Sequence, residues 1–354
     1  MIRSLTFHIG DFKTGTTAIQ RFLTTPEAKH IGLWAPLPNC DALAHSVQDP
    51  SIAPLAFAEL AQRLEDGHGH AVLSSEHFES VDPRGLRGLI DAYLPHYADR
   101  IGVVGYLRPH ASSLLARYAE SLKIGSFAGT LDAYCDWKPS FWRLRAARRF
   151  QKWREAFGGA FHLRLFDRAM FPGGDIRRDF AQSLSFCDAP DLGDARENTT
   201  VTVIDLAYLS ALQSAIGPTA NGSIAEMARR KIGQRIAEVM ARGHSLGGPK
   251  LRLHASLGER LWHGYRADAA ELDALYFENG PVIRDLLQSR DAAQSQSVPH
   301  MEERDWLGPS ARQSARAWGE ALGAQLRTED GAMEVLTSFA TPSFDATLDL
   351  KKYA

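Results

Sequence analysis

Short apolar runs alternate with helical patterns along the first half of the chain. Four runs are mostly apolar without alternation, as expected of strands that are buried on both faces of a parallel sheet. They cover residues 5–9, 71–74, 101–107 and 161–166. Apolar positions at helical spacing lie between the runs. These helical patterns cover residues 54–64, 86–94, 112–123 and 144–157. Strands that alternate with helices predict an α/β fold in which helices flank a parallel sheet.

The strand-like runs stop after about residue 180, and longer helical patterns follow. Four helices are predicted there, at residues 203–216, 223–241, 257–288 and 310–326. Polar and turn-rich residues 290–302 indicate a hinge, and residues from 341 onward an irregular tail. We therefore expect an α/β domain with a mainly helical second half over residues 1–289. A C-terminal helical extension and tail would cover residues 290–354.

Composition and charge narrow the class of protein. The chain has 354 residues and a formal net charge of −2, so it has no overall attraction to nucleic acid or to an anionic membrane. No apolar run approaches the roughly 20 residues that cross a bilayer. The three cysteines, Cys40, Cys135 and Cys187, lie far apart and predict neither a zinc site nor a disulfide framework. Because the first strand begins almost at once, we expect no signal peptide and a cytoplasmic location.

The first predicted strand runs into a loop that suits an anion. Residues 8–17 read H-I-G-D-F-K-T-G-T-T. Gly10 and Gly15 permit a tight turn, and the backbone N–H groups of the following helix point toward whatever anion lies there. Lys13 adds a mobile positive charge. Hydroxyl donors are supplied by Thr14, Thr16 and Thr17.

The position of the lysine separates two kinds of phosphate loop. In the nucleoside triphosphatase motif the lysine follows the second glycine, but Thr16 stands there in this chain and Lys13 precedes Gly15. The order G-x-x-K-T-G-T-T, followed by Gln20, resembles instead the 5′-phosphosulfate loop of bacterial sulfotransferases. Those enzymes belong to the P-loop type and use 3′-phosphoadenosine-5′-phosphosulfate. The resemblance extends in general order through about residue 285.

That resemblance implies a set of donor-binding residues. Lys13 would stabilise the leaving phosphate. Arg108, which ends the third predicted strand and precedes Pro109, matches the arginine of the 3′-phosphate loop. The serine expected eight residues later is replaced by Ala116, so one contact to that phosphate has no counterpart. The implied donor-binding residues are Gly10, Phe12, Lys13, Thr14, Gly15, Thr16, Thr17 and Arg108.

The second predicted strand ends in S-S-E-H, at residues 74–77. Ligands of open α/β sheets lie beyond the carboxyl ends of the strands, so Glu76 should emerge beside the phosphate loop. The resemblance implies Glu76 as the general base, with His77 as the alternative. The residues alone fit another interpretation equally well, in which Ser75 caps a helix and Glu76 lies in its first turn.

Other polar residues are interpreted more simply. His8 reads as a core histidine that is bonded to the backbone. The basic residues between 137 and 155 fit an amphipathic helix with a solvated face better than an entrance for an anionic glycan. His68, His70 and His77 show no metal-ligand spacing, and we assign no metal.

These observations predict an enzyme that moves a sulfuryl group from 3′-phosphoadenosine-5′-phosphosulfate to a hydroxyl, or to an amine, of a saccharide or another small acceptor. No metal would be required. Two alternatives stay open, a nucleotide-dependent phosphotransferase and a catalytically silent nucleotide- or glycan-binding module. The sequence identifies neither the acceptor nor the oligomeric state.

Overall fold

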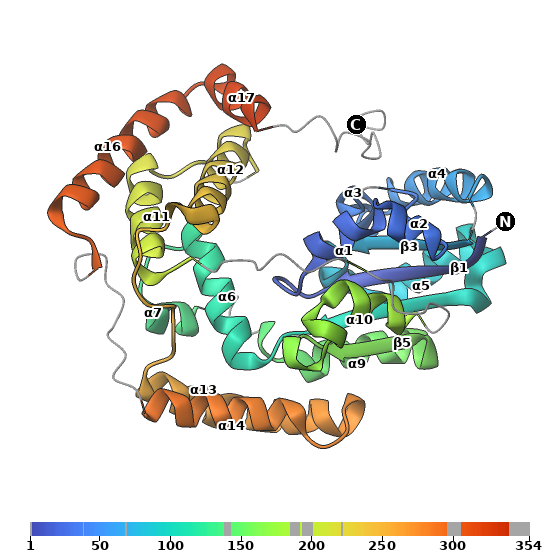
Figure 1. Ribbon diagram of the computed structural model, residues 1–354. Helices are drawn as coiled ribbons and strands as arrows, with labels where there is room; N and C mark the ends of the chain where they lie inside the picture. Colours follow the sequence, from blue (N-terminus) through green and yellow to red (C-terminus); the bar gives the residue numbers. More distant parts are fainter. Residues whose placement is uncertain are drawn as a thin grey trace.

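A five-stranded parallel sheet forms the centre of the first half of the chain (Figure 1). This computed structural model describes residues 2–37, 39–67, 69–137, 143–184, 192, 201–220, 222–295 and 306–339. The strand order is β2-β3-β1-β4-β5, and every pairing is parallel. The strands are β1 Ile2–Gly10, β2 Leu33–Trp34, β3 Gly69–Ser75, β4 Ile101–Leu107 and β5 Phe161–Leu165. The α/β fold predicted from the apolar runs is therefore confirmed.

Helices cover both faces of this sheet. Along β1, successive side chains point to opposite faces, and Leu5, Phe7 and Ile9 join the core that α4, α5 and α9 close. The opposite face is closed by α1, α2 and α10, whose apolar residues pack on Val72 and Val104. The helices of this half are α1 Thr16–Leu23, α2 Pro26–His30, α3 Asp41–Ser46, α4 Ala53–Glu65, α5 Pro83–Tyr93, α6 His110–Lys123, α7 Leu131–Asp136, α9 Ala146–Phe157 and α10 Ile176–Ser183.

The described residues of the second half are mainly helical, as predicted. Figure 1 shows α6 extending away from the sheet toward α11 and α12, while α13 and α14 lie side by side. A separate apolar core joins α11, α12, α16 and α17. The helices are α11 Val203–Ile216, α12 Ile224–Val239, α13 Ala255–Tyr276, α14 Pro281–Gln294, α16 Pro309–Gln325 and α17 Glu329–Ser338. None of the described helices is long and apolar enough to span a membrane.

Helix ends depart from the predicted bounds where local chemistry intervenes. The helix predicted over residues 257–288 is two helices, because Asn279 and Gly280 adopt positive φ and Pro281 begins α14. The predicted hinge is helical as far as Gln294. Most of its remainder, and the predicted tail from residue 341, lie outside the described residues.

Candidate active site

The predicted anion loop connects β1 to α1 at the carboxyl edge of the sheet. Register places Ile9 beside Ser75 and Gly10 beside Tyr106, so the ends of β3 and β4 flank the loop. Gly15 precedes α1 with φ 79°, and no side chain among the described residues caps this helix. The first N–H groups of a helix have no intrahelical partner. The loop therefore presents unpaired donors at the positive end of a helix dipole.

Buried polar atoms around the loop lack partners among the described residues. Thr16 is 5% exposed, and its hydroxyl forms no hydrogen bond with any residue that the structure describes. A Cβ on Gly10 would overlap that hydroxyl, so the glycine provides the space that it occupies. Burying an unbonded hydroxyl costs about 1–3 kcal/mol. An anion with acceptor oxygens would satisfy the Thr16 hydroxyl, whereas the hydroxyl of Thr14 is already bonded to the Asp11 carbonyl.

Lys13 stands at the tip of the loop in a left-handed conformation, with φ 67°. Such a conformation in a residue other than glycine costs on the order of 1–3 kcal/mol and persists where its surroundings fix it. The Arg108 Nη1 donates to the Lys13 carbonyl over 2.7 Å. The Lys13 ammonium lies 2.8 Å from Oε2 of Glu120 on α6, with 38% of the side chain exposed. The lysine is thus held by its backbone and ion-paired through its side chain.

Arg108 extends from the carboxyl end of β4 toward the same loop. Its guanidinium lies over the ring of Phe166, 5.2 Å from the centroid, and its buried Nε has no hydrogen-bond partner within the described part of the chain. Ala116 lies on α6, and the hydroxyls of Ser112 and Ser113, earlier on the same helix, already have partners within the protein. Ser112 donates to the Pro109 carbonyl, and Ser113 accepts from Arg117.

The end of β3 brings Glu76 and His77 to the site. Ser75 caps the short helix η1 Glu76–Ser80 by accepting from the His77 N–H at 3.0 Å, as the simpler interpretation predicts. The same turn leaves Glu76 half-buried. Burial raises the pKa of its carboxyl, although the Lys13 ammonium acts in the opposite direction. The His77 ring meets the edge of Phe12 at 6.0 Å and lies 4.5 Å from the His45 ring.

His8 lies in the core below the loop, as predicted, but its ring is bonded to the Ser74 side chain where a backbone partner was predicted. Its Nδ1 is 2.8 Å from the Ser74 hydroxyl, and burial lowers the pKa of the ring to about 3. The ring is therefore neutral at physiological pH.

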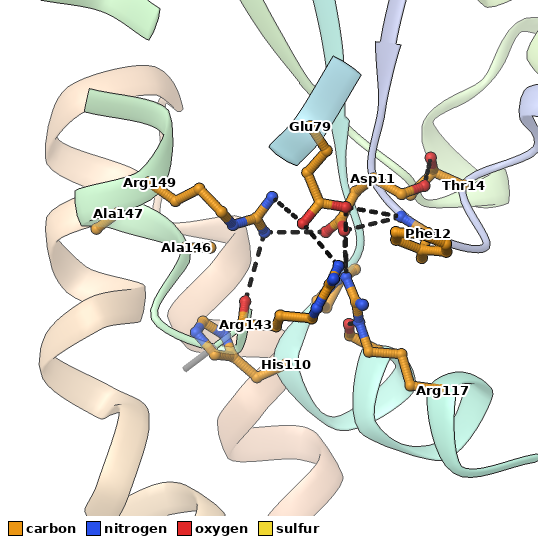
Figure 2. Close-up of polar contacts among 12 residues, drawn as sticks. Asp11, Phe12, Thr14, Glu79, His110, Arg117, Arg143, Ala146, Ala147 and Arg149 are labelled. Atoms are coloured by element: carbon orange, nitrogen blue, oxygen red, sulfur yellow. Dashed lines mark hydrogen bonds and ion pairs between the residues drawn. The ribbon is translucent and has the colours of Figure 1, made fainter. Parts of the chain in front are cut away.

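A buried charge cluster behind the loop was not predicted from the sequence (Figure 2). Asp11 is ion-paired to Arg117 of α6 and lies 3.2 Å from Arg149 of α9. Glu79 of η1 lies 2.8 Å from the Arg149 Nη1 and 3.5 Å from Arg143. We call Asp11, Glu79, Arg117, Arg143 and Arg149 the loop cluster. All but Arg143 are at least nine-tenths buried.

The pKa values of the two carboxyls in the loop cluster are shifted in opposite directions. Burial alone would raise the pKa of Asp11, but Arg149 and Arg117 hold that pKa below its usual range. Burial raises the pKa of Glu79, and the opposing charge of Arg149 does not cancel this rise. Two carboxyls in contact do not readily ionise together, because adjacent negative charges repel. One pKa therefore falls while the other rises.

Comparisons with known proteins give one structural likeness. Neither a known protein family nor a curated protein matches the sequence. The chain is similar in structure to a sulfotransferase from Alicyclobacillus acidocaldarius. The two share 16% sequence identity with a TM-score of 0.38, over 69% of this chain and 96% of the other.

The basic residues between 137 and 155 lie in two different environments. Residues 138–142 of this stretch lie outside the described residues. Arg145, Arg148 and Lys152 line an open cavity of about 590 Å³ between α9 and α13, opposite Asp268 and Glu271. Arg149 also borders this cavity, but its guanidinium reaches the buried carboxylates of the loop cluster. The prediction of a solvated basic face was wrong for Arg149, because two buried carboxylates attract it.

Among the described residues, no group of three or more histidine, cysteine or acidic side chains could hold a metal ion.

Proposed function

We propose that this chain is a sulfotransferase that moves a sulfuryl group from 3′-phosphoadenosine-5′-phosphosulfate to a hydroxyl or amine of a small acceptor, such as a saccharide. The convergence of Thr16, Arg108 and Glu76 on the loop that carries Lys13 supports this proposal most directly. These residues come from a helix start and from the ends of β3 and β4, the two strands that flank β1. Together they offer anion donors, positive charge and a carboxylate base at one edge of the sheet.

Different groups of the site would bind the 5′-phosphosulfate and the 3′-phosphate of the donor. The backbone N–H groups at the start of α1 and the Thr16 hydroxyl would bind the 5′-phosphosulfate oxygens. The Arg108 guanidinium would bind the 3′-phosphate, and its buried Nε has no partner among the described residues. The residues that would take part through the loop are Gly10, Phe12, Lys13, Thr14, Gly15, Thr16 and Thr17.

The transfer itself needs a proton acceptor and a stabilised leaving group. Glu76 would take the proton from the acceptor as the acceptor oxygen or nitrogen forms its bond to sulfur. The bond between sulfur and the bridging oxygen breaks in line, and the Lys13 ammonium would stabilise the negative charge on the departing phosphate. His77 is the second candidate for the base. Lys13 and Arg108 supply the positive charge, so this mechanism requires no divalent metal.

Ligand binding tests the donor assignment without an acceptor. We expect adenosine 3′,5′-bisphosphate at about 100 times its Kd to stabilise the purified protein by about 2.7 kcal/mol, because the ligand binds only the folded chain. Thermal unfolding with and without the ligand measures this. ATP with Mg²⁺ is the comparison. Stabilisation by ATP and Mg²⁺ alone would favour a phosphotransferase, and stabilisation by neither would refute the assignment to a nucleotide donor.

Gly10→Ala tests the space around the Thr16 hydroxyl. We expect the new methyl to displace that hydroxyl and to raise the Kd for adenosine 3′,5′-bisphosphate by about tenfold, since a hydrogen bond to a charged group contributes about 1.5–3 kcal/mol. Calorimetric titration measures the change. Thr16→Val is the matched variant because it removes the hydroxyl and leaves Gly10 in place. If both variants bind as the unchanged protein does, the hydroxyl does not contact the ligand.

A further inference from the structure

The loop cluster joins the β1–α1 loop to three other parts of the chain. Asp11 belongs to the β1–α1 loop, Glu79 to η1, Arg117 to α6 and Arg149 to α9. Figure 2 shows the carboxylates and guanidinium groups facing one another behind Phe12. Both carboxylates also accept from the Phe12 N–H, Asp11 at 2.9 Å and Glu79 at 3.3 Å. The cluster therefore holds the loop backbone itself.

The Phe12 side chain is held from the same side. Its ring lies 5.5 Å from the Arg117 guanidinium carbon and 4.9 Å from that of Arg143. On the other side of the loop tip, Arg108 donates to the Lys13 carbonyl. The Phe12–Lys13 segment is thus held at its first N–H and at its last carbonyl, and Lys13 has the positive φ that needs such support.

Burying several charged side chains together is not expected to add much to the stability of the fold. Taking ions out of water carries a penalty that their mutual attraction offsets only with good geometry, and apolar replacements are often at least as stable. Buried ion pairs do, in some proteins, fix one conformation among several. Here the conformation that the cluster fixes is that of a loop with unpaired N–H donors.

We propose that Asp11, Arg117 and Arg149 are positioning residues that hold the phosphate loop in its anion-binding conformation before the ligand arrives. Arg117 and Arg149 act through Asp11, and Asp11 acts through the Phe12 backbone. If the loop leaves this conformation, the apparent affinity for the anion falls in proportion to the fraction of molecules that keep it. The inference rests on the proposed function only for the choice of adenosine 3′,5′-bisphosphate as the probe.

Asp11→Asn tests the inference because it removes the charge at nearly constant size. We expect the variant to bind adenosine 3′,5′-bisphosphate about tenfold more weakly, as when about one molecule in ten keeps the loop conformation. In the ligand-free variant, hydrogen exchange at the amides of residues 12–17 should be faster, with exchange in β3 and β4 unchanged. Donor KM should rise, while kcat at saturating donor should stay within about threefold because Lys13 and Glu76 are intact.

Asp205→Asn is the control for a general loss of stability. Asp205 is fully buried in α11, where it accepts from the Leu246 N–H at 2.7 Å, far along the chain from the loop. The Asp205→Asn variant should unfold at a lower temperature, with hydrogen exchange at residues 12–17 and affinity for adenosine 3′,5′-bisphosphate unchanged. If Asp11→Asn does not fold, Arg117→Gln, which leaves Arg149 on Asp11, should give a smaller change in the same direction.

Hydrogen exchange in the phosphate loop distinguishes a failure of the positioning proposal from a failure of the proposed function. An unchanged protein that binds no adenosine 3′,5′-bisphosphate would contradict the proposed function, while faster loop exchange in Asp11→Asn would still support positioning. A folded Asp11→Asn or Arg117→Gln variant with unchanged loop exchange and, where the ligand binds, unchanged affinity would overturn the inference.

Discussion

Lys13→Ala should lower kcat by about 10²–10³ while the chain stays folded, as expected when one group that stabilises charge in the transition state is removed. The side chain is 38% exposed and its ion pair with Glu120 lies at the surface of the site, so its loss removes little buried structure. The measurement is the rate of transfer from labelled donor at saturating concentration, with thermal unfolding as a check on folding.

Lys29→Ala is the matched control for this variant. Lys29 lies exposed near the end of α2, away from the loop, and its removal should change neither rate nor stability. A Lys13→Ala enzyme that keeps its full kcat would remove Lys13 from the chemistry. A raised donor KM with unchanged kcat would assign Lys13 to binding alone.

Glu76→Gln should lower kcat/KM by about 10²–10⁴, the usual contribution of a positioned base. The base must be unprotonated, so activity of the unchanged enzyme should fall as pH drops through the pKa of Glu76. Burial raises that pKa, so the fall should be centred above pH 4.5, the ordinary value for a glutamate. The pH–rate profile of the variant should lack this acid limb.

His77→Asn distinguishes the two candidate bases. If Glu76 is the base, this variant should keep the acid limb and lose little activity. If instead the limb persists in Glu76→Gln and disappears in His77→Asn, the histidine is the base. Glu65→Gln, an exposed change at the end of α4, controls for the loss of one negative charge.

The sheet and its loop could be predicted because their signals are local. Buried parallel strands are continuous apolar runs, and the glycines, lysine and threonines of residues 10–17 are adjacent in the sequence. The strand β2 was missed because its two residues, Leu33 and Trp34, are too few to show a period. The break before α14 left a local sign in Asn279, Gly280 and Pro281, but the apolar periodicity on both sides of it hides the interruption.

The loop cluster could not be predicted because its signals are not local. A charged side chain in a helix is ordinarily exposed, and neither Arg117 nor Arg149 differs in type or spacing from its solvated neighbours. Each is buried because Asp11 and Glu79 meet it from distant segments. The sequence places Asp11 in the loop correctly and contains no indication of what faces it.

Glu120 has a second cation nearby. Its Oε2 lies 2.8 Å from the Lys13 ammonium and 3.6 Å from that of Lys123, one turn along α6. Gln234 of α12 also approaches the other oxygen at 3.5 Å. If Lys13 turns toward a phosphate as proposed, Glu120 would therefore not be left as a lone negative charge beside the arriving anion. Lys123 would remain as its counter-ion, so that Lys13 could exchange one anionic partner for another at small electrostatic cost.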